Sequence, residues 1–365
     1  MCAKAYRAAK KNVAPHGFPA FPVLPQHWSP STPPQTGRTL LIKQIGRLCG
    51  SLHCGLRSRF TRSLILRRQH QVTPRDPPTA IVTGGGSGIG REIAQQLIRY
   101  DYRVAVVDQH GETLADRCEG IDQQLALPCP ADVADPAAWH PLIERLRSEW
   151  PRLDLLVNCA GVLACGELHH CQLADLQRVV AINLGGTING CHAATPWLIE
   201  SAATGRPRQR HLPRPGIINI ASIFAMLAPP GFAAYNASKA GVVGLSESLR
   251  GELSPHGLNV TVSLPGATPT GLFERAEFAS PTLAKSIERY LDAAELTAQQ
   301  VGEQTLRAAA RGRAYTVIGK RARRFAWLKR MAAEMTIRRV AERTRQQLGL
   351  PSPPDSTHDE QSRGC

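Results

Sequence analysis

The sequence predicts an α/β fold, a doubly wound parallel sheet of seven strands in a single domain with extended segments at both ends of the chain. From residue 79 onward, short apolar runs alternate with segments of helical periodicity. This alternation is typical of a parallel sheet that is covered on both faces. A glycine-rich turn directly follows the first apolar run, and the excess of positive charge is confined to the two ends.

The first helical segment shows the periodicity clearly, because Ile89, Ile93 and Leu97 are four residues apart and would share one face of a helix. Strands are expected at 79–83, 103–108, 125–129, 153–158, 216–222, 258–264 and 314–319. Helices are expected at 88–100, 136–150, 173–202, 233–253 and 297–311. The basic, proline-broken stretch 203–215 is predicted to be a surface loop before a central strand.

The two ends differ from this domain, which we place at 79–319. Residues 1–75 contain 13 Lys or Arg and no acid, and prolines interrupt them. We expect 1–78 to be a disordered extension, either an organellar transit segment or the result of a start codon assigned too far upstream. A basic amphipathic helix is expected at 320–348, followed by a disordered tail at 349–365. The helix could lie on an anionic membrane surface through 320–347, or pack on the body or a second subunit.

Composition excludes several classes of protein. The formal net charge is +15, but the ends account for it and leave about −6 for the rest of the chain. The core has no aromatic-basic RNA motif, so nucleic-acid binding is not expected. Ten cysteines without a C-x-x-C pair predict reduced thiols and no metal site. Without a membrane-spanning apolar run or a secretory leader, the expected location is cytoplasmic.

The turn after the first strand is predicted to bind a dinucleotide. Its glycines would let the backbone approach a pyrophosphate, and the following helix would direct free N–H groups at it, as in Rossmann-like folds. The residues concerned are Gly84, Gly86, Ser87, Gly88, Ile89 and Gly90. Asp108 ends the second strand, where a carboxylate can accept ribose hydroxyls and repel a 2′-phosphate. No cation stands beside it, so NAD is predicted, with NADP disfavoured.

A second group of residues predicts proton transfer. Tyr235 and Lys239 are four apart at the start of a helix and would share one face. A nearby ammonium favours the phenolate, so we expect it to lower the pKa of Tyr235 toward neutral pH, where general acid–base catalysis is efficient. Ser222 ends the preceding strand at the carboxyl edge of the sheet. Its hydroxyl could hold the substrate oxygen beside Tyr235.

In this ordered set of motifs, residues 79–319 resemble the short-chain dehydrogenase/reductase family, in its single-domain subfamily of about 250 residues. The motifs are TGGGSGIG at 83–90, Asp132-Val133, NCAG at 158–161, Asn183, Ser222, Tyr235-x-x-x-Lys239, and Pro265-Gly266 with Thr270. The resemblance implies a hydride transfer between a nicotinamide dinucleotide and an alcohol or ketone. It also implies a homodimer or homotetramer.

The resemblance also implies roles for individual residues. Tyr235 would be the general acid/base, Ser222 would orient the reacting oxygen, and Lys239 would bind the nicotinamide ribose. Asn183 would hold a water that links Lys239 to solvent, although it could also cap a turn. The remaining cofactor-binding residues would be Asp132, Val133, Asn158, Ala160, Gly161, Pro265, Gly266, Thr268 and Thr270. The family more often has Ile or Val where this chain has Thr268, and its segment between Asn183 and Ser222 is shorter.

Apolar residues around the predicted site favour a lipophilic alcohol or ketone as the small-molecule substrate. They include Phe224 to Leu227 after the serine and Phe232 before the tyrosine. The alternative is a catalytically silent dinucleotide sensor or scaffold on the same fold. The presence of the complete set of catalytic residues argues against this alternative.

Overall fold

A computed structural model describes residues 76–109, 125–205, 209–292, 294 and 296–350. The extension predicted at 1–78 therefore lies outside the described residues apart from its last three, and the tail at 349–365 lies outside them apart from its first two. Within the described part, no helix is both long and apolar enough to cross a bilayer.

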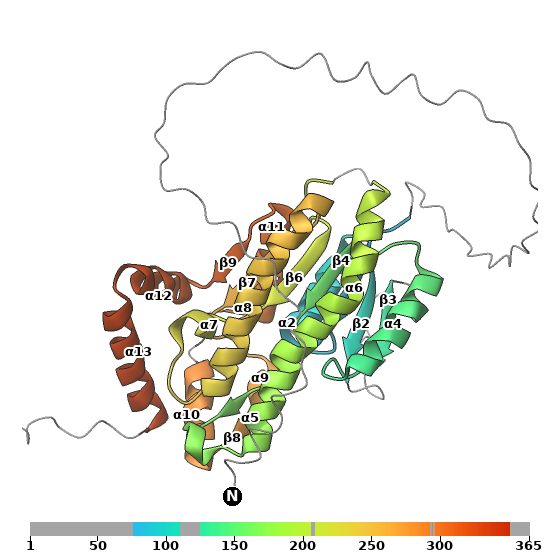
Figure 1. Cartoon of the computed structure of the whole chain (residues 1–365). Helices are drawn as coiled ribbons and strands as arrows, with labels where there is room; N and C mark the ends of the chain where they lie inside the picture. Colours follow the sequence, from blue (N-terminus) through green and yellow to red (C-terminus); the bar gives the residue numbers. More distant parts are fainter. Residues whose placement is uncertain (1–75, 110–124, 206–208, 293, 295, 351–365) are drawn as a thin grey trace, which may run out of the picture. The chain divides into compact units, whose positions relative to one another are not determined.

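The central feature is a parallel sheet of seven strands in the order β3-β2-β1-β4-β6-β7-β9 (Figure 1). This confirms the predicted fold class. The strands are β1 (Thr79–Thr83), β2 (Arg103–Asp108), β3 (Ala126–Pro130), β4 (Leu155–Asn158), β6 (Gly216–Ile220), β7 (Asn259–Pro265) and β9 (Tyr315–Ile318). They lie within two residues of the expected bounds. The order reverses at β1, where the chain leaves β3 and β2 on one side and continues with β4 on the other.

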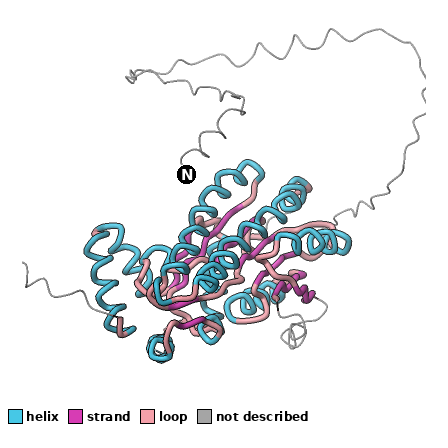
Figure 2. Tube along the Cα trace, turned by 60° about the horizontal axis from the view of Figure 1, so that its bottom comes forward, coloured by secondary structure: helices cyan, strands magenta, loops and turns pink. Residues whose placement is uncertain are grey.

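Helices cover both faces of this sheet (Figure 2). On one face, α2 (Gly88–Arg99) packs against α11 (Ala298–Ala310), and Gln96 of α2 donates a hydrogen bond to the carbonyl of Gln299 (3.1 Å). On the other face lie α4 (Pro136–Glu149), α6 (Gly186–Ala203) and α8 (Ala233–Leu253). Because both faces are covered, strands such as β1 (TAIVT) and β4 (LLVN) are nearly continuous apolar runs. β7 (NVTVSLP) alternates instead, and its Thr261 and Ser263 are buried as well.

The segment predicted as one helix at 173–202 is interrupted. The structure has α5 (Leu173–Val180), then a π-helical turn (Ala181–Gly185), then α6. Asn183 lies in the π turn, where its side chain makes hydrogen bonds to the backbone of Val162 in the loop after β4 instead of facing solvent. A π turn inserts one extra residue into the helix, and such turns are often found at functional sites.

A small lobe covers the carboxyl edge of the sheet. It contains the short helices α7 (Phe224–Leu227) and α9 (Gly271–Glu274), the helix α10 (Pro281–Asp292), and a two-stranded ladder of β5 (Ala164–Cys165) with β8 (Glu277–Phe278). Leu283 and Ile287 of α10 pack with Phe232 and Tyr235 in one apolar cluster. The lobe therefore packs around the tyrosine that the sequence singles out.

The helix expected at 320–348 is two helices, α12 (Lys320–Met331) and α13 (Ala333–Leu348), which meet at the non-helical Ala332. The apolar residues of this segment are divided between the two helices. Phe325 packs against the body in an apolar cluster with Val340, and Leu348 is buried beside Phe232. Met331 stays 68% exposed. Packing of α13 on the lobe explains the break, which no glycine or proline marks in the sequence. Membrane contact through 320–347 stays a prediction.

Candidate active site

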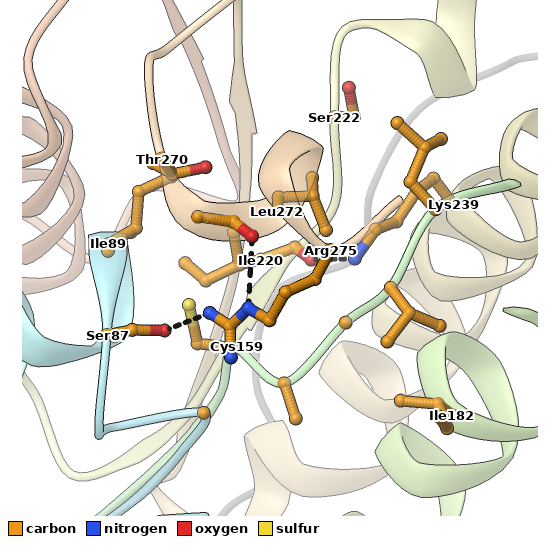
Figure 3. Close-up of a pocket in the computed structure, with 18 of the residues that line it drawn as sticks. Ser87, Ile89, Cys159, Ile182, Ile220, Ser222, Lys239, Thr270, Leu272 and Arg275 are labelled. Atoms are coloured by element: carbon orange, nitrogen blue, oxygen red, sulfur yellow. Dashed lines mark hydrogen bonds between the residues drawn. The ribbon is translucent and has the colours of Figure 1, made fainter. Parts of the chain in front are cut away.

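The carboxyl ends of the strands open onto a cavity of about 360 Å³, between the glycine-rich turn, the start of α8 and the lobe (Figure 3). Most of the residues predicted from the sequence line it. They are Gly84, Ser87, Gly88, Ile89, Gly90, Asp108, Asp132, Val133, Ala160, Gly161, Ser222, Tyr235, Lys239, Pro265, Gly266, Thr268 and Thr270. Gly86, Asn158 and Asn183 are predicted site residues that support the wall from behind instead of lining it.

The glycine-rich turn is built so that only glycine fits. Gly84 has a φ of +64°, and a Cβ there would lie 2.8 Å from the backbone nitrogen of Ala160. A Cβ on Gly90 would lie 2.2 Å from the carbonyl oxygen of Gly84. The turn therefore folds back tightly on the first turn of α2, and at its glycines the bare backbone borders the cavity. Such a surface can accept an anionic group at close range.

Asp108 is tied to this turn. Its carboxylate accepts a hydrogen bond from the backbone N–H of Gly86 (3.2 Å), and its side chain is buried at the end of β2. The bond fixes the carboxylate against the glycine-rich turn, where it lines the cavity. Asp132, at the end of β3, instead accepts from the backbone of Ala134 (2.9 Å) and shapes the next turn.

Arg275 is a cavity residue that the sequence did not identify as a binding residue. Its guanidinium extends from the end of α9 to the glycine-rich turn and donates a hydrogen bond to the Ser87 hydroxyl (2.7 Å), while Nε donates to the carbonyl of Gly271 (3.0 Å) (Figure 3). The contact joins residues 188 positions apart. It places a cation beside the N-terminus of α2, whose partial charge is also positive. This end of the cavity therefore holds a cation beside the helix N-terminus as well as the Asp108 carboxylate.

Tyr235, Lys239 and Ser222 converge on the opposite wall, and all three are buried. The Lys239 ammonium lies 5.8 Å from the centre of the Tyr235 ring and donates to the carbonyl of Ile220 (3.0 Å). The Ser222 hydroxyl accepts from the backbone N–H of Phe224 (3.2 Å) and hydrogen bonds to the tyrosine. The predicted grouping is thus present, with the tyrosine and serine hydroxyls together.

Burial determines the acidity of this pair. Desolvation raises the pKa of Tyr235 to about 12, against the opposing effect of the hydrogen bond with Ser222. Desolvation also lowers the pKa of Lys239 from 10.5 to about 8. The sequence predicted that the ammonium would lower the tyrosine pKa. The structure shows the reverse direction, because the loss of water around the buried phenol is the largest effect on its pKa.

The lowered pKa of Lys239 predicts a pH-dependent stability. Between about pH 8 and pH 10.5 the unfolded chain keeps a proton that the folded chain releases, so the free energy of unfolding should rise with pH in this window. We expect the unfolding free energy of the wild type to increase relative to that of Lys239→Met as pH rises from 8 toward 10. Urea unfolding measures the difference, with the exposed Lys285→Met as a control for loss of one charge. A difference independent of pH would contradict the prediction.

Asn183 connects three elements behind the tyrosine. Its side-chain oxygen accepts from the backbone N–H of Val162 (2.8 Å), and its nitrogen donates to the carbonyl of Val162 (3.0 Å) and to the Ser238 hydroxyl (3.1 Å). A Cβ on Gly161 would lie 3.1 Å from Asn183 Oδ1 and 3.5 Å from Lys239 Nζ. Asn183 therefore holds the loop after β4 against α8, close to the lysine.

A buried chain of polar side chains also links the sheet to α8. Asn158 of β4 donates to Asn219 of β6 (2.9 Å), Asn219 donates to Ser246 of α8 (2.9 Å), and Ser246 donates to the carbonyl of Val242 (2.6 Å). Of these residues, only Asn158 is predicted from the sequence to belong to the site. The other two could have been noticed as polar residues in a strand and a helix that are otherwise packed in the core.

The segment after β7 closes the cavity over the glycine-rich turn. Thr268 donates to the carbonyl of Gly266 (3.0 Å), which bends the chain. Thr270 then begins α9, and a Cβ on Gly88 would lie 3.2 Å from the Thr270 Cβ. Thr268, where the family more often has Ile or Val, therefore forms a local turn. Thr270 still reaches the start of α2.

Comparisons with known proteins agree with this geometry. A family model described as short chain dehydrogenase matches residues 78–279. The chain is 33% identical over 202 residues to "Probable oxidoreductase EphD" of Mycobacterium tuberculosis, a match that covers 55% of this chain and only 32% of that protein. It is 34% identical over 194 residues to "3-oxoacyl-[acyl-carrier-protein] reductase FabG" of Staphylococcus aureus. This match covers 52% of this chain and 73% of that protein.

Solved structures also match. A short-chain dehydrogenase/reductase from Burkholderia phymatum in complex with NAD has a TM-score of 0.64 at 23% identity, covering 72% of this chain and 96% of that one. A 3-ketoacyl-(acyl-carrier-protein) reductase from Brucella melitensis complexed with NADH has a TM-score of 0.57 at 25% identity, covering 67% and 98%. A short-chain dehydrogenase from Sphingobium yanoikuyae in complex with NADPH has a TM-score of 0.57 at 25% identity, covering 71% and 95%.

Proposed function

The chain belongs to the short-chain dehydrogenase family, and from this premise we propose that it transfers a hydride between a nicotinamide dinucleotide and a secondary alcohol or ketone. One observation carries the proposal. The buried Ser222, Tyr235 and Lys239 face the same cavity as the glycine-rich turn and Asp108. A proton-transfer group and an anion-accepting backbone surface thus border one space.

The residues present fit a dinucleotide. Glycines at 84 and 90 let the turn pack against the backbone of Ala160 and the start of α2, and the backbone of the turn, which borders the cavity, would hold the pyrophosphate. Asp108 supplies an acceptor for ribose hydroxyls, and Arg275 supplies a cation beside Ser87. When bound, the nicotinamide supplies the carbon that gives or takes the hydride. Lys239 would hold the adjoining ribose, and Thr268 and Thr270 would border the carboxamide.

The chain's own part in the reaction is to position the substrate and move a proton. Ser222 would hold the substrate oxygen beside the Tyr235 hydroxyl. In ketone reduction the neutral phenol donates its proton to the oxygen that becomes an alcohol. In alcohol oxidation the phenolate takes that proton back. Because burial raises the pKa of Tyr235 to about 12, the tyrosine is set to act as an acid at neutral pH.

A thermal-shift screen against NAD, NADP and NADH tests the proposal first. A dinucleotide at ~100 times its dissociation constant should add ~2.7 kcal/mol to the unfolding free energy. Oxidation of secondary alcohols and reduction of ketones, including 3-oxoacyl thioesters because of the reductases that the chain resembles, then test catalysis. Binding without turnover of any of these compounds would favour a dinucleotide sensor instead.

Asp108 is proposed to select NAD over NADP, because its carboxylate would repel a 2′-phosphate. Asp108→Ser is expected to raise NADP affinity relative to NAD by roughly tenfold, which corresponds to about 1.4 kcal/mol. Isothermal titration with both dinucleotides measures the ratio. Glu144→Gln, at an exposed carboxylate on α4 outside the cavity, should leave it unchanged. An unchanged ratio in the Asp108 variant would show that specificity lies elsewhere, and Arg275 would then be the residue to test.

We also propose that the chain forms a dimer or tetramer through α5 and α6. Leu173, Val180 and Ile188 are apolar residues on these helices that stay exposed, with Leu173 67% accessible. Light scattering is expected to give a mass above one chain, and Ile188→Arg should shift it toward the monomer. A monomeric wild type would contradict this.

A further inference from the structure

A second cavity of about 280 Å³ lies between the small lobe and the C-terminal helices α12 and α13. Its outer wall includes Ala322, Phe325, Val340 and Leu348. All four lie beyond residue 279, where the match to the family model ends. This wall is therefore built by a part of the chain that the family comparison does not describe.

The second cavity adjoins the candidate active site. Ile223, Phe224, Gly266 and Ala267 line both cavities. The Phe224 ring lies 5.0 Å from the Phe232 ring and 6.2 Å from the Tyr235 ring, measured between centroids. One aromatic side chain and a short stretch of small residues thus separate the reacting tyrosine from the second cavity.

The lining of the second cavity combines apolar walls with positive charge. Three cations, Lys320, Arg321 and Arg343, border it, and none of its described lining residues is a carboxylate. Lys320 and Arg343 are exposed, so they stand where the apolar space meets solvent. An apolar chain that ends in an anionic group matches this arrangement, because the chain would be buried while its charge stays hydrated beside the cations.

Contacts hold the C-terminal helices in this position. Lys329 of α12 donates a hydrogen bond to the carbonyl of Met226 in α7, the helix that carries Phe224. Leu348 at the end of α13 is buried against the loop before α8, and a Cβ on Gly231 would lie 3.3 Å from it. The outer wall and the wall shared with the active site are therefore connected.

We infer that the second cavity receives the distal part of the substrate, an apolar chain that ends in an anionic group such as a carboxylate. The inference rests on the proposed function and narrows its substrate class to anionic amphiphiles. The alcohol or ketone would lie at Tyr235, the chain would pass Phe224, and the anionic end would lie near Lys320 and Arg343. This orientation requires the reacting carbon to be remote from the charged group.

Matched substrate pairs test the inference. The probes are straight-chain 2-alkanols and (ω−1)-hydroxy fatty acids of the same chain lengths, oxidised with saturating dinucleotide. We expect kcat/KM to rise with chain length in both series, by up to about fourfold for each methylene that enters the cavity. Among long chains, the hydroxy acid should exceed the alkanol by about fivefold, as expected for a solvent-exposed charge interaction.

Two variants separate the contributions. Val340→Phe narrows the cavity and should abolish the gain from long chains while a short 2-alkanol is oxidised at the wild-type rate. Lys320→Gln/Arg343→Gln should remove the preference for the carboxylate without changing the 2-alkanol series. Arg338→Gln/Arg339→Gln, at exposed arginines of α13 outside the cavity lining, is the matched control and should behave as wild type.

The results distinguish failure of the inference from failure of the proposed function. Oxidation of short 2-alkanols with no gain from longer chains would overturn the inference and leave the function in place. If Lys320→Gln/Arg343→Gln affected both series equally, the inference that the substrate ends in an anionic group would be wrong. Absence of dinucleotide binding and of turnover with every alcohol would overturn the proposed function and the inference with it.

Discussion

A Tyr235→Phe variant is expected to lose about 10³-fold or more in kcat, equivalent to roughly 4 kcal/mol of barrier. Phenylalanine keeps the ring that packs against Phe224 but removes the hydroxyl that would exchange a proton with the substrate oxygen. The Ser222 hydroxyl only accepts a hydrogen bond from the backbone N–H of Phe224 and keeps its own proton, but a serine hydroxyl is a much weaker acid than a phenol and replaces it poorly. Steady-state oxidation and reduction of the same alcohol–ketone pair measure the loss.

The same variant should bind the dinucleotide almost as tightly as the wild type, because the glycine-rich turn and Asp108 are unchanged. The thermal shift with NAD is therefore the control for folding and binding. Ser222→Ala should lower kcat less severely, since it removes an orienting bond and leaves the proton donor. Wild-type turnover by Tyr235→Phe would contradict the assigned role, and loss of NAD binding would show that the substitution acts on the fold.

Asp154→Ala is expected to destabilise the protein by about 3–5 kcal/mol, the largest stability effect that we predict from a single side chain. Arg152 is 1% exposed, and its guanidinium donates to both oxygens of Asp154, with a shortest distance of 2.5 Å. Asp154 also accepts from the backbone N–H of Thr79 (3.0 Å) at the start of β1. Removing the carboxylate would leave a buried cation without its counter-charge.

Urea unfolding measures this effect, and the chain offers a matched control. Arg145 and Glu149 form an ion pair at 3.4 Å in which both side chains are about half exposed. Glu149→Ala should therefore cost less than about 1 kcal/mol. Arg152→Met/Asp154→Leu should recover much of the loss, because it removes both charges. Equal costs for the buried and exposed pairs would contradict the assigned importance of burial.

Local patterns in the sequence were sufficient to predict the sheet and most of the cavity. Apolar runs define strands without knowledge of the fold, and the turn at 83–90 and the Tyr235–Lys239 spacing are each contained within one turn or helix. The break at Ala332 was not predictable in this way, since helix propensity continues through it and packing of α13 decides it. The Arg275–Ser87 contact joins distant segments, so no spacing rule indicates it.

The pKa of Tyr235 could not be predicted from the sequence either. The four-residue spacing correctly places the ammonium near the phenol, but it does not reveal how much water each group loses. Both groups are buried, and this reverses the expected direction of the tyrosine pKa. Electrostatic arguments from spacing therefore give partners reliably, whereas the resulting pKa depends on solvent access.

The polar chain from Asn158 through Asn219 to Ser246 affects how precisely the catalytic side chains are oriented. Apolar contacts tolerate a small rotation of a helix about its axis, whereas hydrogen bonds weaken steeply when their angle changes. Ser246 lies two turns beyond Lys239 on α8, so the hydrogen bond that it accepts from Asn219 fixes the rotation of this helix against the sheet. The stereoselectivity of hydride transfer to a substrate would then depend on the Ser246 hydroxyl, which does not contact the substrate.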